Sequence, residues 1–572
     1  MSPDKSVVEI GPLDEVDQAD GVDRADGVSD GVDRADGVDR ADGVDRADGV
    51  SDDVLTDDVD HADGVSDDGV TSGVVAIPRR PQKGQNFEVV VERLDAKGQG
   101  EAWLRVAVGP QGQLKRYGVL VRKGLPGDRV RIRVDAIKRG VIEAGVEEVL
   151  EPSERRIEPR CRHFGQREEP GRGCGGCTLQ SLEYVDQLEV KRGLIARAMK
   201  GAGLERLEVA PVLGHVDPWY YRNKMEFSFG TDREDKLSLG LRPAGWRREV
   251  LALSECHLSS PFVSGFVPLI LGWAERMGLE PYHYGRNAGF LRTLTVREGK
   301  RTGERMVELT TTADEIVMSA EGLTSAEGLA SSFVKAAHAA AKALGGVLTS
   351  IHWTQHVALK KERTRLVTRH LYGKPALHEE MRLPGGHKLR FEINPRAFFQ
   401  PNTLQAEVLY GEVIKTAKLA RGSAARVLDL YCGTGTIGLC LAPYAASVVG
   451  VELVEDAVEN ARHNARINGL GGVTFFAGDA GKLLKSELAG QPFDLVVVDP
   501  PRSGLMPEAV AHLSALAPPR LVYVSCNPVA LARDLAGLFK AGYTLEGALQ
   551  PVDLFPHTPH VETIATLVRA EV

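Results

Sequence analysis

A cysteine near the end of the chain stands where a thiol could act on a bound molecule. Cys526 follows the apolar run 521–524, which is typical of a buried strand, and it precedes Asn527 and Pro528. Open α/β sheets bind their ligands beyond the carboxyl ends of such strands. A thiolate in this place could add to C6 of a uracil ring and make C5 nucleophilic toward a methyl sulfonium. The alternative is that Cys526 is a small buried hydrophobe.

A carboxylate further along the chain could supply the base that this chemistry needs. After methyl transfer, the C5 proton must be removed before the thiol can be expelled. Glu562 closes the segment His557-Thr-Pro-His-Val-Glu562 and is the candidate base, with His557 and His560 near it in sequence. The pair therefore predicts covalent catalysis on an otherwise unreactive ring carbon.

A glycine-rich turn predicts a nucleotide-type cofactor. The predicted strand 427–430 leads into Tyr431-Cys-Gly-Thr-Gly-Thr436, where Gly433 and Gly435 allow a tight turn and close backbone approach before a helix. Glu452 ends the next strand, in a position that suits hydrogen bonds from ribose hydroxyls. NAD sites more typically carry the longer Gly-x-Gly-x-x-Gly, so this turn, with Asp479 after a third strand, favours S-adenosylmethionine. The alternative is a purely structural turn.

The motif Asp499-Pro-Pro-Arg502 follows a strongly apolar strand. It is similar to the Asn/Asp-Pro-Pro-aromatic motif of amino-group methyltransferases, in which the aromatic ring stacks on the base. Here the fourth residue is Arg502, which argues against nitrogen methylation. Asp499 is then available to hydrogen-bond the edge of a base.

Four cysteines predict a metal site away from this edge. Cys174 and Cys177 form a C-x-x-C pair, with Cys161 upstream and Cys256 far downstream. Four thiolates suit a [4Fe–4S] cluster or a structural zinc ion, and their spacing does not decide between the two. Of the remaining cysteines, Cys432 and Cys440 are interpreted as structural.

Aromatic and cationic residues alternate in Trp219-Tyr-Tyr-Arg-Asn-Lys224. Such a mixture can stack on extruded bases while its cations hold phosphates. The alternative is the start of an ordinary strand with exposed charges.

The elements that would position these residues follow from composition and periodicity. Residues 1–76 carry 23 acidic and 5 basic side chains, so the rest of the chain has a net charge of +9 although the whole has −9. A basic body fits a phosphate-bearing partner. No apolar run is long enough to span a bilayer, and seven unevenly spaced cysteines without a signal sequence favour a reducing cytoplasm over a disulfide framework.

Four regions are predicted. Residues 1–77 repeat Asp-Gly-Val-Asp-Arg-Ala and are expected to be disordered, because they bury too little surface to offset chain entropy. Residues 78–153 alternate apolar and polar residues, which predicts a small β-barrel. Residues 154–395 form a mixed α/β region with the cysteines and an insertion near 319–332. Residues 396–572 alternate strands and helices, which indicates a parallel sheet covered on both faces.

Together the motifs resemble the RNA 5-methyluridine methyltransferase family, from about residue 83 to the C-terminus. The resemblance implies a class I, Rossmann-like S-adenosylmethionine domain, an OB-like TRAM barrel that binds RNA, and a central cluster domain. It implies that Cys526 is the nucleophile and Glu562 the base. It favours a [4Fe–4S] cluster on Cys161, Cys174, Cys177 and Cys256, although residues 166–172 lengthen the usual gap. It also implies that six residues line the cofactor and base pockets: Gln400, Tyr431, Thr436, Glu452, Asp479 and Asp499.

The barrel and the cysteines together look most like the 23S ribosomal RNA enzymes, so ribosomal RNA is expected over the T-loop of transfer RNA. No protein partner is predicted. Two alternatives stay open: an RNA cytosine-C5 or amino methyltransferase, and a non-catalytic RNA-binding factor.

Overall fold

The computed structural model describes residues 75–77, 80–108, 113–164, 173–243, 249–314, 316–320, 322–357 and 365–569. The acidic repeat lies outside the described residues up to position 74. At the end of that segment, Val75–Ile77 form strand β1. The cysteine-loop stretch 166–172 also lies outside them.

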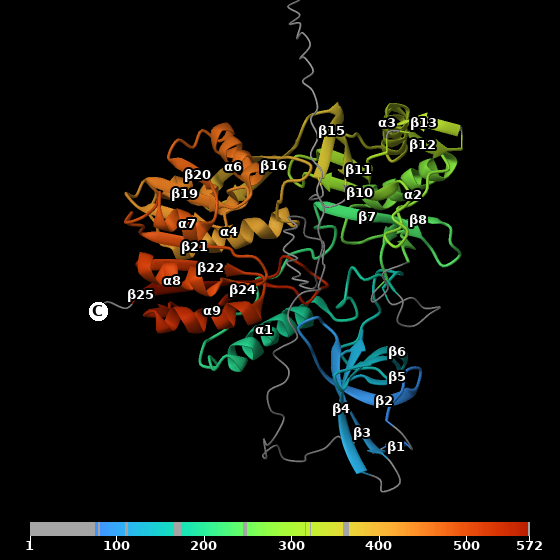
Figure 1. Ribbon diagram of the computed structural model, residues 1–572. Helices are drawn as coiled ribbons and strands as arrows, with labels where there is room; N and C mark the ends of the chain where they lie inside the picture. The colour runs from blue at the N-terminus through green and yellow to red at the C-terminus, as the bar shows by residue number, and fades with distance from the viewer. Residues whose placement is uncertain are drawn as a thin grey trace, which may run out of the picture. The chain divides into compact units, whose positions relative to one another are not determined.

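The first sheet is a small barrel, as the alternating sequence predicts (Figure 1). Its strand order is β1-β3-β2-β5-β6-β4, and the additional pairing of β3 with β4 closes it. Alternate residues such as Val89, Val130 and Ile142 fill its interior. The strands after β1 are β2 (Asn86–Leu94), β3 (Gly100–Val108), β4 (Gln113–Arg122), β5 (Arg129–Lys138) and β6 (Val141–Glu151).

The second sheet has seven strands in the order β15-β14-β11-β10-β7-β8-β9. Helices α2 (Pro261–Arg276) and α3 (Ala326–Ala343) bury their apolar sides in its core. The predicted insertion is a hairpin of β12 (Ile316–Ser319) and β13 (Gly322–Ser325) that leads directly into α3. The sheet strands are β7 (Lys224–Thr231), β8 (Leu237–Leu241), β9 (Leu251–Ala252), β10 (Leu291–Glu298), β11 (Arg305–Thr312), β14 (Ser350–Val357) and β15 (Arg365–Gly373).

The third sheet has the order β20-β19-β18-β21-β22-β25-β23, and β24 also pairs with β25. Strands β18 to β22 are parallel, and β25 runs antiparallel to β22. The strands are β18 (Arg426–Leu430), β19 (Ser447–Glu452), β20 (Val473–Ala477), β21 (Leu495–Val498), β22 (Arg520–Ser525), β23 (Tyr543–Leu545), β24 (Gln550–Val552) and β25 (Glu562–Arg569).

Helices cover both faces of this sheet because its strands are apolar on both sides. Val427 packs with α4, α5 and α6, whereas the next residue, Leu428, packs with α1, α7, α8 and α9. The predicted α/β class with a covered parallel sheet is confirmed. The helices are α1 (Tyr184–Gly201), α4 (Thr403–Ala417), α5 (Thr436–Leu441), α6 (Glu455–Ile467), α7 (Ala480–Lys485), α8 (Pro507–Leu516) and α9 (Pro528–Lys540), with short 3-10 turns η1 (Pro384–Gly386) and η2 (Ala442–Tyr444).

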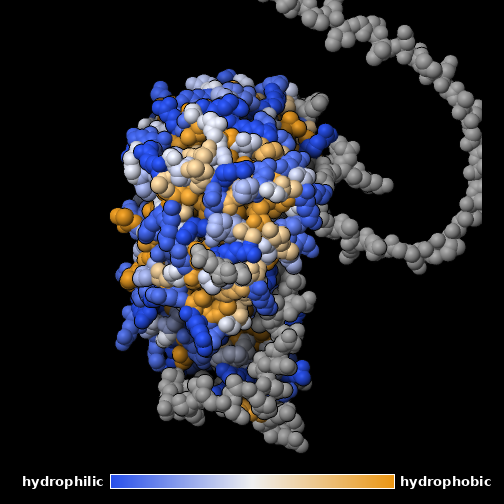
Figure 2. Space-filling view, turned by 90° about the vertical axis from the view of Figure 1, so that its left-hand side faces the viewer, coloured by the Kyte–Doolittle hydropathy of each residue, from blue (hydrophilic) through white to orange (hydrophobic). Residues whose placement is uncertain are grey.

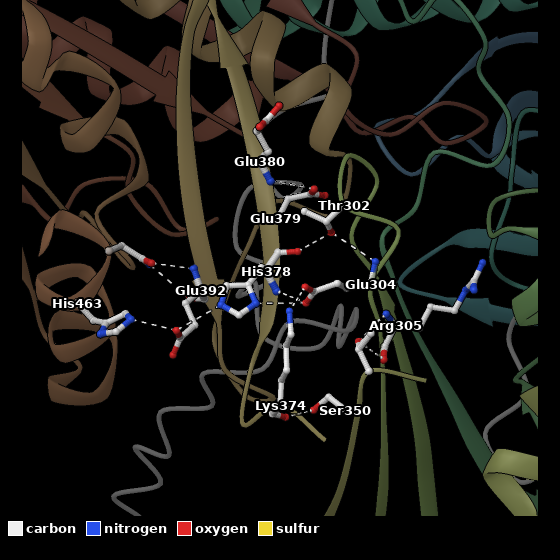
Figure 3. Close-up of polar contacts among 12 residues, drawn as sticks. Thr302, Glu304, Arg305, Ser350, Lys374, His378, Glu379, Glu380, Glu392 and His463 are labelled. Atoms are coloured by element: carbon white, nitrogen blue, oxygen red, sulfur yellow. Dashed lines mark hydrogen bonds and ion pairs between the residues drawn. The ribbon is translucent and has the colours of Figure 1, made fainter. Parts of the chain in front are cut away.

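A hairpin of β16 (Leu377–Leu383) and β17 (His387–Ile393) joins the second and third sheets through polar contacts. Figure 3 shows His378 between two carboxylates, at 3.3 Å from Glu304 and 3.6 Å from Glu392. His463 of α6 lies 3.0 Å from Glu392 on the other side. Burial raises the pKa of Glu304, but hydrogen bonds from Lys374 and His378 outweigh it and hold that pKa below its ordinary value.

The face drawn in Figure 2 carries hydrophobic residues in separate patches among hydrophilic ones. Among the described residues, none of the helices combines the length and the apolar character that crossing a bilayer requires.

Candidate active site

The register of two strands brings Cys526 and Glu562 together. In the antiparallel pair β22–β25, Ser525 is the partner of Thr563. The next position along each strand is Cys526 on one side and Glu562 on the other. Asp499 follows the neighbouring strand β21, whose last residue, Val498, pairs with Tyr523. The three predicted side chains therefore meet at one edge of the third sheet.

Burial sets the protonation of this group. Burial raises the pKa of Asp499 to about 7, and burial together with Asp499 raises the pKa of Glu562 to about 8. Burial and the two carboxylates raise the pKa of Cys526 to about 12, against the weaker opposing effect of Arg502. Cys526 is thus a protonated thiol at neutral pH, beside two carboxyl groups that can exchange its proton.

A buried tyrosine that the sequence analysis missed belongs to the same group. Tyr410 of α4 is 3% exposed and hydrogen-bonds the Gln400 side chain. Burial, followed by Asp499, Cys440 and Glu562, raises the pKa of Tyr410 well above its ordinary value. No sequence signal marks Tyr410, because it lies within an ordinary amphipathic helix.

The predicted cofactor turn lies at the carboxyl end of β18. Tyr431, Gly433 and Gly435 all have positive φ angles, of 62°, 53° and 75°. A Cβ atom on Gly435 would lie 2.6 Å from the Phe475 ring, so only glycine fits there. Thr436 begins α5 directly after it and is buried.

Two acidic residues flank this turn. Glu452 ends β19, and its carboxylate accepts hydrogen bonds from the backbone N–H groups of Gly433 (3.1 Å) and Val454 (3.0 Å). Its remaining lone pairs can accept from hydroxyl groups of a ligand. Asp479 caps α7 by accepting a hydrogen bond from the Lys482 N–H at 2.9 Å. Both carboxylates thus occupy the edge of the sheet where the sequence predicts them.

Beneath the turn lies a third carboxyl group, Asp429, which the sequence analysis also missed. Its Oδ2 accepts a hydrogen bond from the Gly438 N–H at 2.8 Å, while its buried Oδ1 has no hydrogen-bond partner. Burial raises the pKa of Asp429 to about 8. Asp429 therefore supports the glycine turn from inside the protein.

The connection that carries Glu562 is a loop of nine residues, 553–561, between β24 and β25. Asp553 begins it and forms a fully buried ion pair with Lys191 of α1. Tyr184 Oη (2.8 Å) and the Phe555 N–H (3.0 Å) also donate to Asp553. Helix α1 thus anchors the first turn of this loop.

The middle of the loop is held at His557, a buried residue with a φ of 67°. Gln187 of α1 accepts from its N–H at 2.9 Å, and the N–H groups of Thr178 and Leu179 donate to its carbonyl at 2.9 and 3.0 Å. A Cβ atom on Gly98 of the barrel would lie 3.1 Å from Thr178 Oγ1 and 3.3 Å from Pro559 Cγ. Leu94 and Leu125 of the barrel region also pack with Leu179 and Leu182, so the barrel contacts the segment after Cys177, which in turn holds the loop before Glu562.

The four cysteines predicted as metal ligands lie in one region. Cys161 and Cys177 are buried in a small cluster with Phe164, Tyr221 and Leu258, and Cys256 packs against it. Cys174 interacts electrostatically with Cys161 and Cys256. Among the described residues, however, no group of three or more His, Cys, Asp or Glu side chains is arranged to hold a metal ion.

Two buried cations face these cysteines. Lys123 Nζ and Arg222 Nε are both buried without a hydrogen-bond partner. Burial lowers the pKa of Lys123, whereas Cys174, Cys177 and Cys161 raise it. The ammonium group also lies 4.3 Å from the centre of the Phe164 ring. Two cationic side chains beside four thiols fit an anionic thiolate site.

The aromatic and cationic motif 219–224 divides into two parts. Tyr221 is buried and donates to the Pro556 carbonyl at 3.2 Å, and Asn223 donates to the Gln400 carbonyl at 2.8 Å. These residues tie the second sheet to the active-site loop. Trp219 and Tyr220 are half-buried, and the exposed Arg160 guanidinium lies 5.1 and 5.2 Å from their ring centres.

Comparisons with known proteins place this site in context. Residues 335–570 match the family model described as tRNA (Uracil-5-)-methyltransferase. An uncharacterized RNA methyltransferase of Caldanaerobacter subterraneus is 35% identical over 496 residues, which cover 85% of this chain and 100% of that protein. One of Protochlamydia amoebophila is 37% identical over 451 residues, covering 77% and 98%.

Among solved structures, the tRNA (uracil-54, C5)-methyltransferase of Pyrococcus abyssi, in complex with S-adenosyl-L-homocysteine, matches with a TM-score of 0.61. It is 27% identical, and the match covers 84% of this chain and 100% of that chain.

Proposed function

Because the chain belongs to the RNA (uracil-5-)-methyltransferase family, we propose that Cys526 and Glu562 convert a uridine in RNA to 5-methyluridine. The observation that carries the proposal is the strand register that sets this thiol opposite this carboxylate at the edge of the third sheet. The family uses S-adenosylmethionine, which would supply the methyl group as an electrophilic sulfonium.

The first step is addition of the thiol to the base. Cys526 gives its proton to Asp499, which leaves Glu562 ionised for the second step, and its sulfur forms a bond to C6 of the uracil. The electron pair of the C5–C6 double bond then moves toward C5 and the adjacent carbonyl. Asp499, with a pKa raised by burial to about 7, can donate a hydrogen bond to a carbonyl oxygen of the base when protonated. C5 is now nucleophilic and would take the methyl group from the sulfonium, whose S–CH3 bond would break to leave a neutral thioether.

The second step releases the product. Ionised Glu562 removes the proton from C5, the double bond re-forms, and the C6–sulfur bond breaks with its electron pair returning to Cys526. The target uridine must leave its stack to reach Cys526, since C6 is not accessible within stacked bases.

The cofactor is expected at the glycine turn. Tyr431, Gly433, Gly435 and Thr436 would approach it with their backbone, and Glu452 and Asp479 would accept its hydroxyl and amino protons. Gln400 and Asp499 would lie between cofactor and base. Two backbone N–H groups donate hydrogen bonds to the Glu452 carboxylate and hold it at the carboxyl end of β19, which supports this role.

The cysteines would hold a [4Fe–4S] cluster. Four thiols gathered in one region, with the buried Lys123 ammonium lacking a hydrogen-bond partner beside them, fit an anionic cluster. Bound there, it would cross-link Cys161, the 174–177 segment and Cys256. A zinc ion on the same four thiolates is the alternative.

The substrate we favour is 23S ribosomal RNA, on the basis of the barrel, interpreted as a TRAM domain over 78–153, together with the cysteine set. The remaining proposed regions are the central domain 154–395 and the methyltransferase domain 396–572. The second candidate is the T-loop of transfer RNA, which the similarity to the Pyrococcus abyssi tRNA enzyme favours.

Methyl transfer from labelled S-adenosylmethionine to unmodified total RNA tests these proposals. We expect label in large ribosomal RNA, recovered as 5-methyluridine. Label confined to transfer RNA would keep the chemistry and overturn the substrate. Cys526→Ala should abolish transfer, whereas Cys440→Ala, which removes a buried thiol from helix α5, should retain it. Glu562→Gln should accumulate a covalent RNA adduct. Normal methylation by Cys526→Ala would refute the mechanism.

A further inference from the structure

A cavity outside the proposed catalytic group lies against the loop that carries Glu562. It has a volume of about 190 Å³, and its walls include Ile157, Leu182, Tyr184, Trp219 and His557. None of the residues that line it is Cys526, Glu562, Asp499 or Gln400. Pockets for drug-sized ligands usually occupy about 300–1,000 Å³. The space therefore suits a single ring system better than a whole cofactor.

The aromatic wall of the cavity is fixed in place. Trp219 stacks on His557 with ring centres 3.8 Å apart and an angle of 25° between the rings. The His557 ring lies 3.1 Å from the Pro218 carbonyl and 3.2 Å from Gln187 Nε2. Because Gln187 Nε2 can only donate, Nδ1 is the acceptor and Nε2 carries the proton toward the carbonyl. Burial lowers the pKa of His557 to about 3, so the wall is neutral at physiological pH.

Charge is confined to the mouth of the cavity. Arg160 is exposed there, and its Nη2 donates to Tyr220 Oη at 2.9 Å. Glu158 and Glu183 are the other charged lining residues, and both are exposed. Two carboxylates at the rim and an uncharged interior disfavour a phosphate inside the cavity. A cation at the mouth suits a phosphate just outside it.

We propose that this cavity receives an unpaired nucleobase of the substrate RNA, other than the target uridine, while Arg160 holds the phosphate of that nucleotide. The inference rests on the proposed function, since it assumes that the substrate is an RNA whose bases can be extruded. Stacking against the Tyr184 ring, beside the Trp219–His557 pair, would provide the binding, as in other sites that take single-stranded bases.

Recognition in this cavity would depend on shape more than on base identity. The Gln187 side chain is already engaged by the Leu182 carbonyl, His557 Nδ1 and the His557 N–H. Gln180 Oε1 accepts from the Cys161 N–H at 3.2 Å, and the Gln180 side chain also hydrogen-bonds Cys177. Neither amide is therefore available to read the edge of a base, and the cavity would select an extruded base of suitable position in the RNA fold.

An abasic scan tests the proposal. RNA oligonucleotides that bracket the methylated uridine would each carry one abasic nucleotide, and KM for RNA would be measured with the full-length enzyme. For the wild type we expect one position besides the target at which the missing base raises KM by roughly 5- to 150-fold, the range of base–aromatic stacking. In Ile157→Trp, which fills the cavity, intact RNA should show the raised KM, and the same abasic position should add nothing further.

Controls separate this inference from the proposed function. Val185→Phe adds an aromatic ring at an exposed α1 position that does not line the cavity and should leave KM unchanged. Retained affinity for S-adenosylmethionine shows that a variant is folded. If Ile157→Trp loses that affinity, Arg160→Gln replaces it, and it should raise KM and reduce the salt dependence of binding by about one charge.

Two results would overturn the inference: an unchanged KM in a folded cavity-filling variant, or abasic penalties that are identical in wild type and variant at every position. A wild type that methylates no RNA would instead refute the proposed function.

Discussion

Replacing Lys191 by methionine should loosen the loop that leads to Glu562. The side chains of Lys191 and Asp553 are both 0% exposed, so the substitution would leave a carboxylate buried without its cation. Removing one partner of a buried pair costs about 3–5 kcal/mol. Asp553 keeps two hydrogen bonds, from Tyr184 Oη and from the Phe555 N–H, so we expect the lower end, about 3 kcal/mol.

The assay is amide hydrogen exchange, because it reports local opening in a large protein where a single unfolding transition is not defined. A loss of about 3 kcal/mol corresponds to roughly 100-fold faster exchange through that opening. The effect should appear in α1 and in residues 553–561. The matched control is Lys200→Met, the same change at an exposed position in the last turn of α1.

A second variant isolates the unpaired charge as the cause. Lys191→Met/Asp553→Asn removes the charge but keeps an acceptor for the Phe555 N–H, so it should exchange more slowly than Lys191→Met alone. Exchange in Lys191→Met that matches Lys200→Met would refute the reasoning, because the buried pair would then contribute nothing to the loop.

Three further outcomes are expected. Gly98→Ala should slow release of the covalent adduct, because its Cβ atom would press on Thr178 and Pro559. The control is Gly140→Ala, which carries the same left-handed strain of about 1–2 kcal/mol but has nothing within 4 Å of its Cβ atom. It should leave adduct levels unchanged. Turnover should rise as pH passes through about 7 and about 8, the pKa values that burial gives Asp499 and that burial and Asp499 give Glu562, since Asp499 must begin ionised to take the thiol proton and Glu562 must be ionised to take the C5 proton. These raised values lie above the unfolded ones of about 4, so the stability that the two groups contribute is complete below pH ~4 and is lost as pH rises through ~8. Thermal unfolding should therefore move to lower temperature between about pH 4 and pH 8, and less so in Glu562→Gln. Lys123→Met should lower the iron content of purified protein relative to the exposed Lys83→Met, and equal iron content in both would contradict a charge-compensating role.

The sequence predicts features of the site that depend on local pattern. Apolar runs identify the strands before Tyr431, Asp499 and Cys526, and parallel strands present their carboxyl ends at one edge. It follows that these residues share an edge. The pattern does not predict that β25 runs antiparallel beside β22, which is what sets Glu562 opposite Cys526.

Features that depend on contacts between distant parts of the chain cannot be predicted from local sequence pattern either. Tyr410 and Asp429 occupy positions that periodicity assigns to a core, and only the packed structure shows a carboxyl or hydroxyl beside the site. The motif 219–224 was interpreted as a possible RNA surface, yet Tyr221 points inward to the loop. Aromatic and basic residues look alike in sequence whether they face a ligand or tie two sheets together.

The supports of loop 553–561 explain how a distant barrel can matter to catalysis. Hairpin connections usually have two to five residues, so a loop of nine does not fix the register of its own strands. A slip of one residue in β25 would turn Glu562 to the opposite face of the sheet, away from Cys526. Helix α1 and the segment after Cys177 hold the loop at Asp553 and His557, and the barrel packs against that segment through Leu94. Each contact lies outside the reacting group, and together these contacts fix the register of β25 that places Glu562 beside Cys526.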